Sequence, residues 1–415
     1  MPTRGVRGEL SEWGARAVAH GSRLPASTAG LLIGVTLALS WVSTSAFGGT
    51  ASVPPHAFYV PIMLAGLRFG AAGALGASLA STLLAGPMSY AEVASRTPQP
   101  LSDWAVRGVF FVLVGQALTA MVGLRTAGLH AELEDLRATR RLWAALDGDR
   151  FSLRYQPIVS LRRGGRIVGA EALVRLEEPD GVTVGPDQFV PEAERTGMIR
   201  AIGAWVLLEA CRQCARWRDE GLLEEGFRLH VNVSPLELDS ATFVEQVQDT
   251  LRASDLDPGM LCIEITEHAI AQDSERFLDT LHQMHRLGVS LALDDYGTGH
   301  AGLGQLQRLP VDVVKIDQSF VTGLDERRDR AVITQHVTSL ARSLGLVTIA
   351  EGVERAQEAA AVERLGCDLV QGYHFGRPMG ADQFTLALAA EGTGARDGAT
   401  PGAPATAPGA PGAPG

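Results

Sequence analysis

The sequence predicts two structural classes in one chain: an N-terminal α-helical membrane domain, then a C-terminal α/β barrel of the (β/α)8, TIM-like type with one antiparallel strand. Two observations predict this combination. Between residues 29 and 124 the chain is a series of apolar, mostly uncharged segments. Between residues 145 and 390 short apolar strands alternate with helix-like stretches, and roughly 250 residues are enough for one such barrel.

Four apolar segments make up the predicted membrane domain. They are residues 29–47, 51–67, 70–89 and 104–124. Each approaches the roughly 20 apolar residues that a helix needs to cross a bilayer, although the second segment is the poorest. A cleaved signal peptide is the alternative for the first segment, and a buried helical domain is the alternative for all four.

Positive charges around these segments predict their orientation. The polar N-terminal segment, residues 1–28, carries four arginines, Arg68 lies between the second and third spans, and Arg125 follows the fourth. The two remaining loops contain only Arg96, which two acids balance. Because arginine and lysine favour the cytoplasmic side, we expect an even number of spans with both ends in the cytoplasm.

The barrel is flanked by two segments of distinct composition. Residues 125–144 are charged, with leucines at helical spacing, which predicts a helical connector that could pair two chains. Residues 391–415 are rich in Pro, Gly and Ala without periodicity, which predicts a disordered tail. The net charge of −11 argues against a nucleic-acid polymer as partner. Cys211 and Cys214 lie on an amphipathic helix without a second pair, so we favour helix packing over metal binding.

Each predicted strand of the barrel is a short apolar run that ends in a polar residue. The strands read FSLRYQPIV (151–159), RIVGAEAL (166–173), RLHVNVS (228–234), LCIEITE (261–267), SLALDD (290–295), DVVKID (312–317), VTIAEG (347–352) and DLVQGY (368–373). Only six residues separate the first two strands, which allows a hairpin there. The other strands alternate with helix-like stretches, which predicts parallel pairing.

Polar residues at the strand ends predict a metal site, because the carboxyl ends of barrel strands meet at one mouth. The strand-end residues are Glu171, Asn232, Glu264, Asp294, Asp295, Lys315, Asp317, Glu351 and Gln371. So many carboxylates need cations beside them, and oxygen ligands favour Mg²⁺ or Mn²⁺. Any one acid alone could be a helix cap or a surface ion pair. His230 and His300 have no partner at ligand spacing, so we expect neither to be a ligand.

The same residues carry a family resemblance. The motifs are YQPIV, EAL at 171–173, FVPEAERTGMI, NVS, EITE, DDYGTG, KID, EGVE and QGY, in this order. Over residues 145–390 they resemble the EAL-domain family, whose activity is the hydrolysis of cyclic di-GMP to linear pGpG with Mg²⁺ or Mn²⁺. No GGDEF-type cyclase motif occurs.

The resemblance implies a role for each matching residue. One ion of a pair would be held by Glu171, Asn232, Glu264 and Asp294, and the second by Asp294, Asp295 and Glu351. Lys315 and Glu351 would position or deprotonate a water, and Glu267 would brace the DDYGTG loop. Substrate contacts or a supporting role would fall to Gln156, Leu173, Arg175, Asp317 and Gln371. The alternative is a catalytically silent member that binds cyclic di-GMP as a receptor.

The apolar spans and the resemblance together predict a setting, and the resemblance implies a partner. The setting would be the bacterial inner membrane, with several spans in lipid and the EAL domain in the cytoplasm. In the family the DDYGTG loop lies near a dimer interface, so we expect a homodimer. The chain departs from the common pattern at Tyr296, usually Phe, and at HAGL 300–303, usually YSSL. These departures concern regulation more than chemistry.

Overall fold

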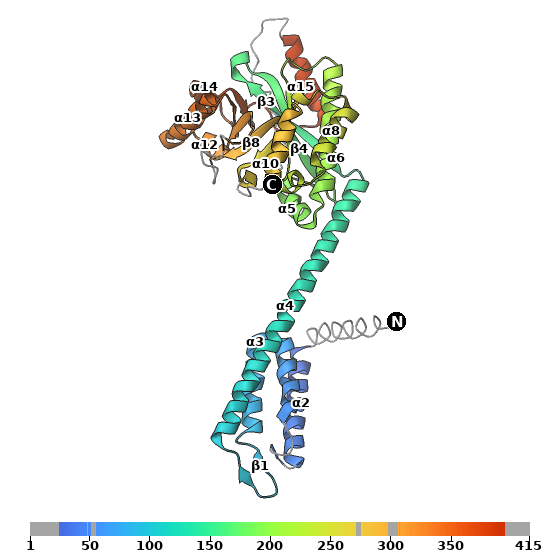
Figure 1. Ribbon diagram of the computed structural model, residues 1–415, viewed down its shortest axis with the longest axis vertical. Coiled ribbons are helices and arrows are strands. Elements are labelled where there is room, and N and C mark those ends of the chain that lie inside the picture. The colour runs from blue at the N-terminus through green and yellow to red at the C-terminus, as the bar shows by residue number, and fades with distance from the viewer. Residues whose placement is uncertain are drawn as a thin grey trace, which may run out of the picture. The chain divides into compact units, whose positions relative to one another are not determined.

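The computed structural model describes residues 25–47, 49–50, 55–270, 275–297, 306 and 308–394. The chain divides into two compact units, Met1–Glu134 and Asp135–Gly415, and the division falls inside the long helix α4, Leu101–Asp147 (Figure 1). The predicted segment 1–28 lies mostly outside the described residues, which begin just before helix α2, Ala26–Ala46.

The N-terminal unit consists of apolar helices and a small hairpin. Helix α2 is followed by the short 3-10 helix η1, Pro55–Phe58, and helix α3, Tyr59–Ala85. Strands β1, Tyr90–Glu92, and β2, Thr97–Pro98, pair antiparallel before α4 begins. In the described part of the chain, three helices are long and apolar enough to cross a membrane: Ala26–Ala46, His56–Ala85 and Leu101–Leu124.

Helix α3 reverses direction at Gly70, so that it contains two of the four predicted spans. Gly70 has φ 65° and ψ −155°, which only glycine adopts readily. The ring of Phe111 packs against Phe58 in a tilted arrangement and against Tyr59 edge to face. Ser78 Oγ donates to the carbonyl of the same Phe111 at 3.0 Å. In a straight helix, 20 residues would separate such contacts by about 30 Å.

The four predicted spans therefore correspond to three helices, the second of which is a folded-back pair. Its arms, 59–69 and 71–85, are each shorter than the roughly 20 residues of a full span. Polar contacts join the C-terminal end of the second arm to α4 and to the segment just before it. Arg107 of α4 and Gln99 both donate to the carbonyl of Ala85. These contacts satisfy carbonyl groups at the helix end that would otherwise lack partners.

The C-terminal unit is a closed barrel of eight strands, and all eight predicted strands are present. Their order around the barrel is β3-β11-β10-β9-β8-β7-β6-β4, closed by pairing of β3 with β4. Strand β3 is antiparallel to both of its neighbours, and the other pairs of the barrel are parallel. The strands are β3 Phe151–Ser160, β4 Arg166–Glu177, β6 Arg228–Asn232, β7 Leu261–Thr266, β8 Ser290–Tyr296, β9 Val313–Ile316, β10 Val347–Ala350 and β11 Leu369–Gln371. The predicted barrel with one antiparallel strand is confirmed.

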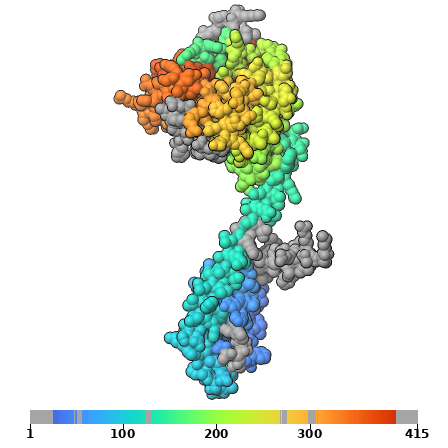
Figure 2. Space-filling view, viewed as in Figure 1, coloured from blue at the N-terminus to red at the C-terminus, as the bar shows by residue number. Residues whose placement is uncertain are grey.

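Helices follow most strands and cover the barrel (Figure 1). They bury one face each, so their sequences are amphipathic. In the space-filling view α10 lies beside α8 on the barrel surface (Figure 2). The helices are α5 Pro186–Thr196, α6 Ile199–Asp219, α7 Pro235–Leu238, α8 Phe243–Ser254, α9 Glu267–Ile270, α10 Glu275–Arg286, α12 Gln318–Val321, α13 Arg328–Ser343, α14 Ala356–Arg364 and α15 Ala381–Gly394. The remaining short elements are η2 Leu161–Arg163, η3 Pro258–Met260 and strand β5 Thr183–Val184, which extends β4.

The predicted C-terminal tail, residues 391–415, begins inside the last turn of helix α15, Ala381–Gly394. Helix α15 continues to Gly394, and residues 395–415 lie outside the described residues. The carboxylate of Glu391 accepts a hydrogen bond from the backbone N–H of Ile167 at 2.9 Å, which ties the last turn to the start of β4. Composition alone could not reveal this contact, because Ile167 and Glu391 are 224 residues apart in the sequence.

Candidate active site

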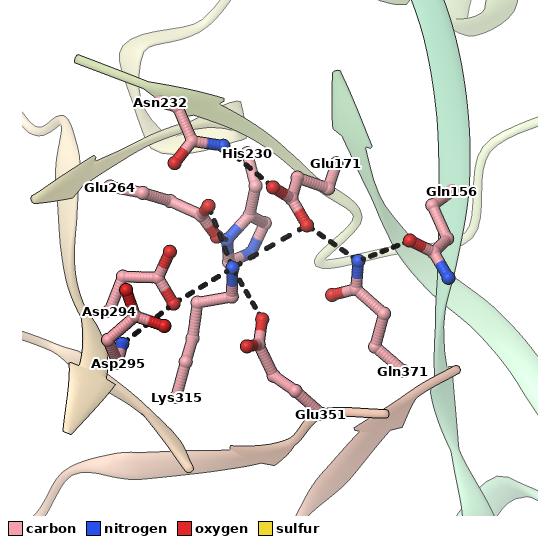
Figure 3. Close-up of polar contacts among 10 residues, drawn as sticks. All are labelled: Gln156, Glu171, His230, Asn232, Glu264, Asp294, Asp295, Lys315, Glu351 and Gln371. Atoms are coloured by element: carbon pink, nitrogen blue, oxygen red, sulfur yellow. Dashed lines mark hydrogen bonds and ion pairs between the residues drawn. The ribbon is translucent and has the colours of Figure 1, made fainter. Parts of the chain in front are cut away.

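An apolar layer closes the barrel interior directly below the candidate site. It contains Ile158, Cys262, Ala292, Val313 and Ile349, all buried. Side chains on one face of a strand repeat every second residue, so the next layer toward the mouth is set by positions two residues away. That layer holds Gln156, Glu264, Asp294, Lys315 and Glu351 (Figure 3).

Lys315 lies at the centre of this layer and is only 1% exposed. Its Nζ atom is 2.7 Å from Glu351 Oε1, 2.8 Å from Glu264 Oε2 and 3.3 Å from Asp294 Oδ1. A fourth carboxylate, that of Glu171, is 3.5 Å away. The predicted lysine and four of the predicted acids therefore converge from five strands or strand ends (Figure 3).

Amide side chains orient the carboxylate of Glu171. Asn232 Nδ2 donates to its Oε1 and Gln371 Nε2 donates to its Oε2, both at 2.6 Å. Gln371 also donates to Gln156 Oε1 at 3.2 Å, and Gln156 donates to the carbonyl of Gly376. The Oε1 atom of Gln371 is buried and has no hydrogen-bond partner among the described residues, so it can accept a bond from a water or ligand.

His230 supports Glu264, a contact that the sequence analysis missed. Its Nδ1 atom is 2.8 Å from Glu264 Oε1, and both side chains are buried. Burial, with the nearby Lys315 charge, lowers the pKa of His230 to about 3, so the imidazole is neutral, and its Nδ1 atom shares a hydrogen bond with Glu264. The signal was present in the sequence, because His230 shares a strand face with Asn232. His300 lies outside the described residues.

Asp294 and Asp295 both reach the mouth because strand β8 is irregular there. The register with β9 shifts between Leu293 and Tyr296, which leaves the two aspartates opposite the single residue Lys315. Asp295 has φ 57°, in the left-handed region, and its N–H donates to Asp294 Oδ1 at 3.0 Å. This bulge turns two consecutive residues, which would face opposite sides of a regular strand, toward one point.

Three carboxylates form a group that could hold a cation. One oxygen each of Asp294, Asp295 and Glu351 lies within 4.8 Å of the other two. The ligand atoms are all oxygens, which fits a hard divalent ion. The residues present therefore fit the metal that the sequence predicts.

The charges of the site are strongly coupled. Burial raises the pKa of Glu264 well above its usual range and that of Glu351 to about 8, and burial with the Asp294 charge raises that of Asp295. Burial would lower the pKa of Lys315, but four surrounding carboxylates raise it well above its usual value. Five carboxylates face one ammonium, so their full ionisation requires additional positive charge.

The other predicted residues lie around this centre. Glu267 Oε2 accepts the N–H of Gly297 at 3.0 Å, and so holds the start of the loop after β8, whose residues 298–305 lie outside the described part. Leu173 and Arg175 follow Glu171 on the same strand face and are half-buried. Asp317 caps α12 by accepting the N–H of Ser319 at 3.0 Å. The structure thus gives Asp317 a local structural contact.

The EAL domain family matches residues 139–378 of this chain. This chain is an EAL-domain protein. The match covers more than half of the sequence and includes the whole cluster around Lys315. The resemblance stated from the motifs is confirmed.

Some curated relatives of this EAL-domain protein have names that refer to cyclic di-GMP. It is 40% identical over 256 residues to the bifunctional diguanylate cyclase/cyclic di-GMP phosphodiesterase MucR of Pseudomonas aeruginosa. The aligned region covers 62% of this chain and 37% of the relative. It is 37% identical over 246 residues to the cyclic di-GMP phosphodiesterase NbdA of the same organism, covering 59% and 31%. The chain thus spans about a third of these relatives' lengths.

Solved structures share the barrel. The structure of the PaMucR phosphodiesterase in complex with c-di-GMP is 39% identical, covers 60% of this chain and 99% of its own, and gives a TM-score of 0.57. The FimX EAL domain from Pseudomonas aeruginosa bound to c-di-GMP is 25% identical, covers 58% and 96%, and gives a TM-score of 0.52.

Proposed function

We propose that this EAL-domain protein is a membrane-bound phosphodiesterase that hydrolyses cyclic di-GMP to linear pGpG. The observation that carries the proposal is the complete set of carboxylates around Lys315 at the carboxyl end of the barrel. The names of its relatives, which include cyclic di-GMP phosphodiesterases, support the substrate.

In this proposal the protein holds two divalent cations, Mg²⁺ or Mn²⁺. Glu171, Asn232, Glu264 and Asp294 would bind one, and Asp294, Asp295 and Glu351 the other. When bound, the ions would supply Lewis-acid activation of a water and of the phosphate. The grouped oxygens of Asp294, Asp295 and Glu351 support this assignment.

The side chains then have complementary roles in hydrolysis. A water oxygen forms a bond to phosphorus, the bond from phosphorus to a ribose O3′ breaks, and that oxygen takes up a proton. Glu351 would accept the proton of the water. Lys315, 2.7 Å from Glu351, orients this carboxylate and attracts the phosphate. Gln156, Leu173, Arg175 and Asp317 would contact the substrate.

The membrane assignment rests on the three apolar helices and on charge. We place them in the bacterial inner membrane with the barrel in the cytoplasm. The reversal of α3 at Gly70 supports an even number of chain passages, because a helix that folds back returns to the side from which it came. Arg68, next to this turn, and Arg125 after the last span then lie on the same side as the N-terminal arginines.

The second candidate function is a silent cyclic di-GMP receptor, since an EAL-domain structure bound to c-di-GMP is among its structural neighbours. The experiment that separates the two is incubation of the purified full chain, in detergent micelles, with cyclic di-GMP and Mg²⁺. We expect pGpG to accumulate only with the metal. Stoichiometric binding without any product would favour the receptor and contradict the enzyme.

A further inference from the structure

Helix α5 contacts helix α4 on one side. Arg195 of α5 pairs with Asp135 of α4, and Arg141 of α4 pairs with Glu192 of α5 at 2.8 Å. Nearby, Ala138, Leu142 and Ala145 of α4 are buried against the barrel unit. The last turns of α4 and helix α5 are therefore joined by charge pairs beside an apolar contact.

The same helix holds the loop that follows β6. Glu194 Oε1 accepts a hydrogen bond from Ser234 Oγ at 2.6 Å. Ser234 is also the N-cap of α7: its Oγ accepts the N–H of Leu236, and its own N–H donates to Glu237 Oε2 at 3.0 Å. The bond from Ser234 to Glu194 therefore ties the loop after β6 to α5.

Asn232 lies two residues before Ser234, and its orientation matters for cation binding. Its Nδ2 atom donates to Glu171 at 2.6 Å, which directs its amide oxygen away from Glu171 (Figure 3). A cation requires that oxygen, since an amide nitrogen is no ligand for a hard ion. A small rotation of the 232–234 segment would move this oxygen, because Asn232 is at the end of its strand.

We propose that Glu194 is a positioning residue: through Ser234 it holds Asn232 in place for cation binding, and through α5 it makes that placement depend on α4. This inference rests on the proposed function, because it uses Asn232 as a metal ligand. Groups that orient a metal ligand typically change metal affinity or activity by about 10- to 100-fold when they are lost.

The barrel has other anchors for this segment, so loss of Glu194 leaves the fold intact. The N–H of Val233 donates to the carbonyl of Glu264 at 3.1 Å, and the Glu237 bond to Ser234 remains. The variant E194A should therefore loosen Asn232 without unfolding the domain. In E194Q the amide oxygen can still accept the Ser234 hydroxyl, so this variant should behave as the wild type does.

The test measures Mn²⁺ binding to the full chain in detergent micelles by electron paramagnetic resonance of the free ion. We expect E194A to weaken binding about tenfold and E194Q to bind as the wild type does. The double variant R141A/R195A, which removes both charge pairs between α4 and α5, should weaken binding by a smaller factor. The control is E363A, which removes an exposed carboxylate of α14. Thermal unfolding verifies that every variant is folded.

Two results would overturn the inference. Wild-type Mn²⁺ affinity in folded E194A would exclude the positioning role, and wild-type affinity in the folded double variant R141A/R195A, which lacks both charge pairs, would exclude the dependence on α4. A different result would contradict the proposed function: the wild type would bind Mn²⁺ and cyclic di-GMP but form no pGpG.

Discussion

Asp294 carries more of the proposed chemistry than any other single side chain. It contacts Lys315 at 3.3 Å, belongs to the carboxylate group with Asp295 and Glu351, and accepts the N–H that fixes the bulge of β8. The substitution D294N keeps the shape of the side chain and removes its charge.

We expect D294N to lower the rate of pGpG formation by at least about 10³-fold, since a bridging metal ligand would lose its charge. Binding of cyclic di-GMP should persist through the remaining contacts. The measurement is single-turnover product formation together with calorimetric binding. D279N, at an exposed position of α10, is the control and should be fully active. A D294N rate close to that of wild type would refute the two-metal assignment.

Glu237 should make the stability of the fold depend on pH. Burial against α6, where a side chain at Gly203 would collide with it, raises its pKa to about 8, and the Glu194 charge adds to this. An acid whose pKa is raised in the folded state stabilises the fold most below its unfolded pKa of about 4.5. This stabilisation is lost as the pH rises to about 8. Above that pH, Glu237 no longer changes the free energy of unfolding.

The variant E237Q keeps an acceptor for Ser234 but cannot ionise, so it should lose this pH dependence. We expect its melting temperature, relative to wild type, to rise between pH 5 and pH 8 by several degrees, as a difference of a few kcal/mol implies. Scanning fluorimetry of the full chain measures this, with E363Q as the matched control. Parallel curves for wild type and E237Q across this range would contradict the assignment.

At the scale of elements, the proposed membrane topology depends on helix α3. Counted by length it is one span, which would place the N-terminus and the end of α4 on opposite sides. The contacts of Phe58 and Ser78 with the same residue, Phe111, instead require reversal at Gly70. Reversal restores the even parity that the arginines predict.

Reporter fusions distinguish the two arrangements. We expect fusions after residues 27, 70 and 126 to report the cytoplasm, and a fusion at residue 97, beside the β1–β2 hairpin, to report the external side. A fusion within the barrel serves as a cytoplasmic control. Opposite signals at 27 and 126 would mean that α3 crosses the membrane once.

The sequence predicted what depends on local pattern and missed what depends on distant contacts. Alternating apolar residues and polar strand ends were sufficient to locate all eight barrel strands, because the side-chain period of a strand is visible in any window. The β8 bulge could not be predicted, since it depends on the register with β9. The Glu391 bond to Ile167 and the His230 bond to Glu264 likewise join residues of different elements.

At the scale of the whole molecule, pairing of two chains could control the candidate active site of each barrel. The leucines of residues 125–144 could pair two copies, and Glu267 holds Gly297 at the start of the loop after β8 at 3.0 Å. The resemblance to the EAL-domain family implies a homodimer with this loop near its interface. We therefore predict that dimerisation raises activity and that Glu267 is needed for it.

The substitution E267A removes the acceptor of the Gly297 N–H, so the strand end that carries Asp294 and Asp295 would lose a restraint. We expect hydrolysis per chain to fall at least about tenfold, because a metal clamp tolerates little displacement of its ligands. The wild type should lose activity per chain when it is diluted from dimer to monomer, while mass photometry follows the oligomer in the same samples. E267A should show a low rate at every dilution. A constant wild-type rate through a verified dissociation would exclude control by dimerisation, whatever the outcome for the metal ligands.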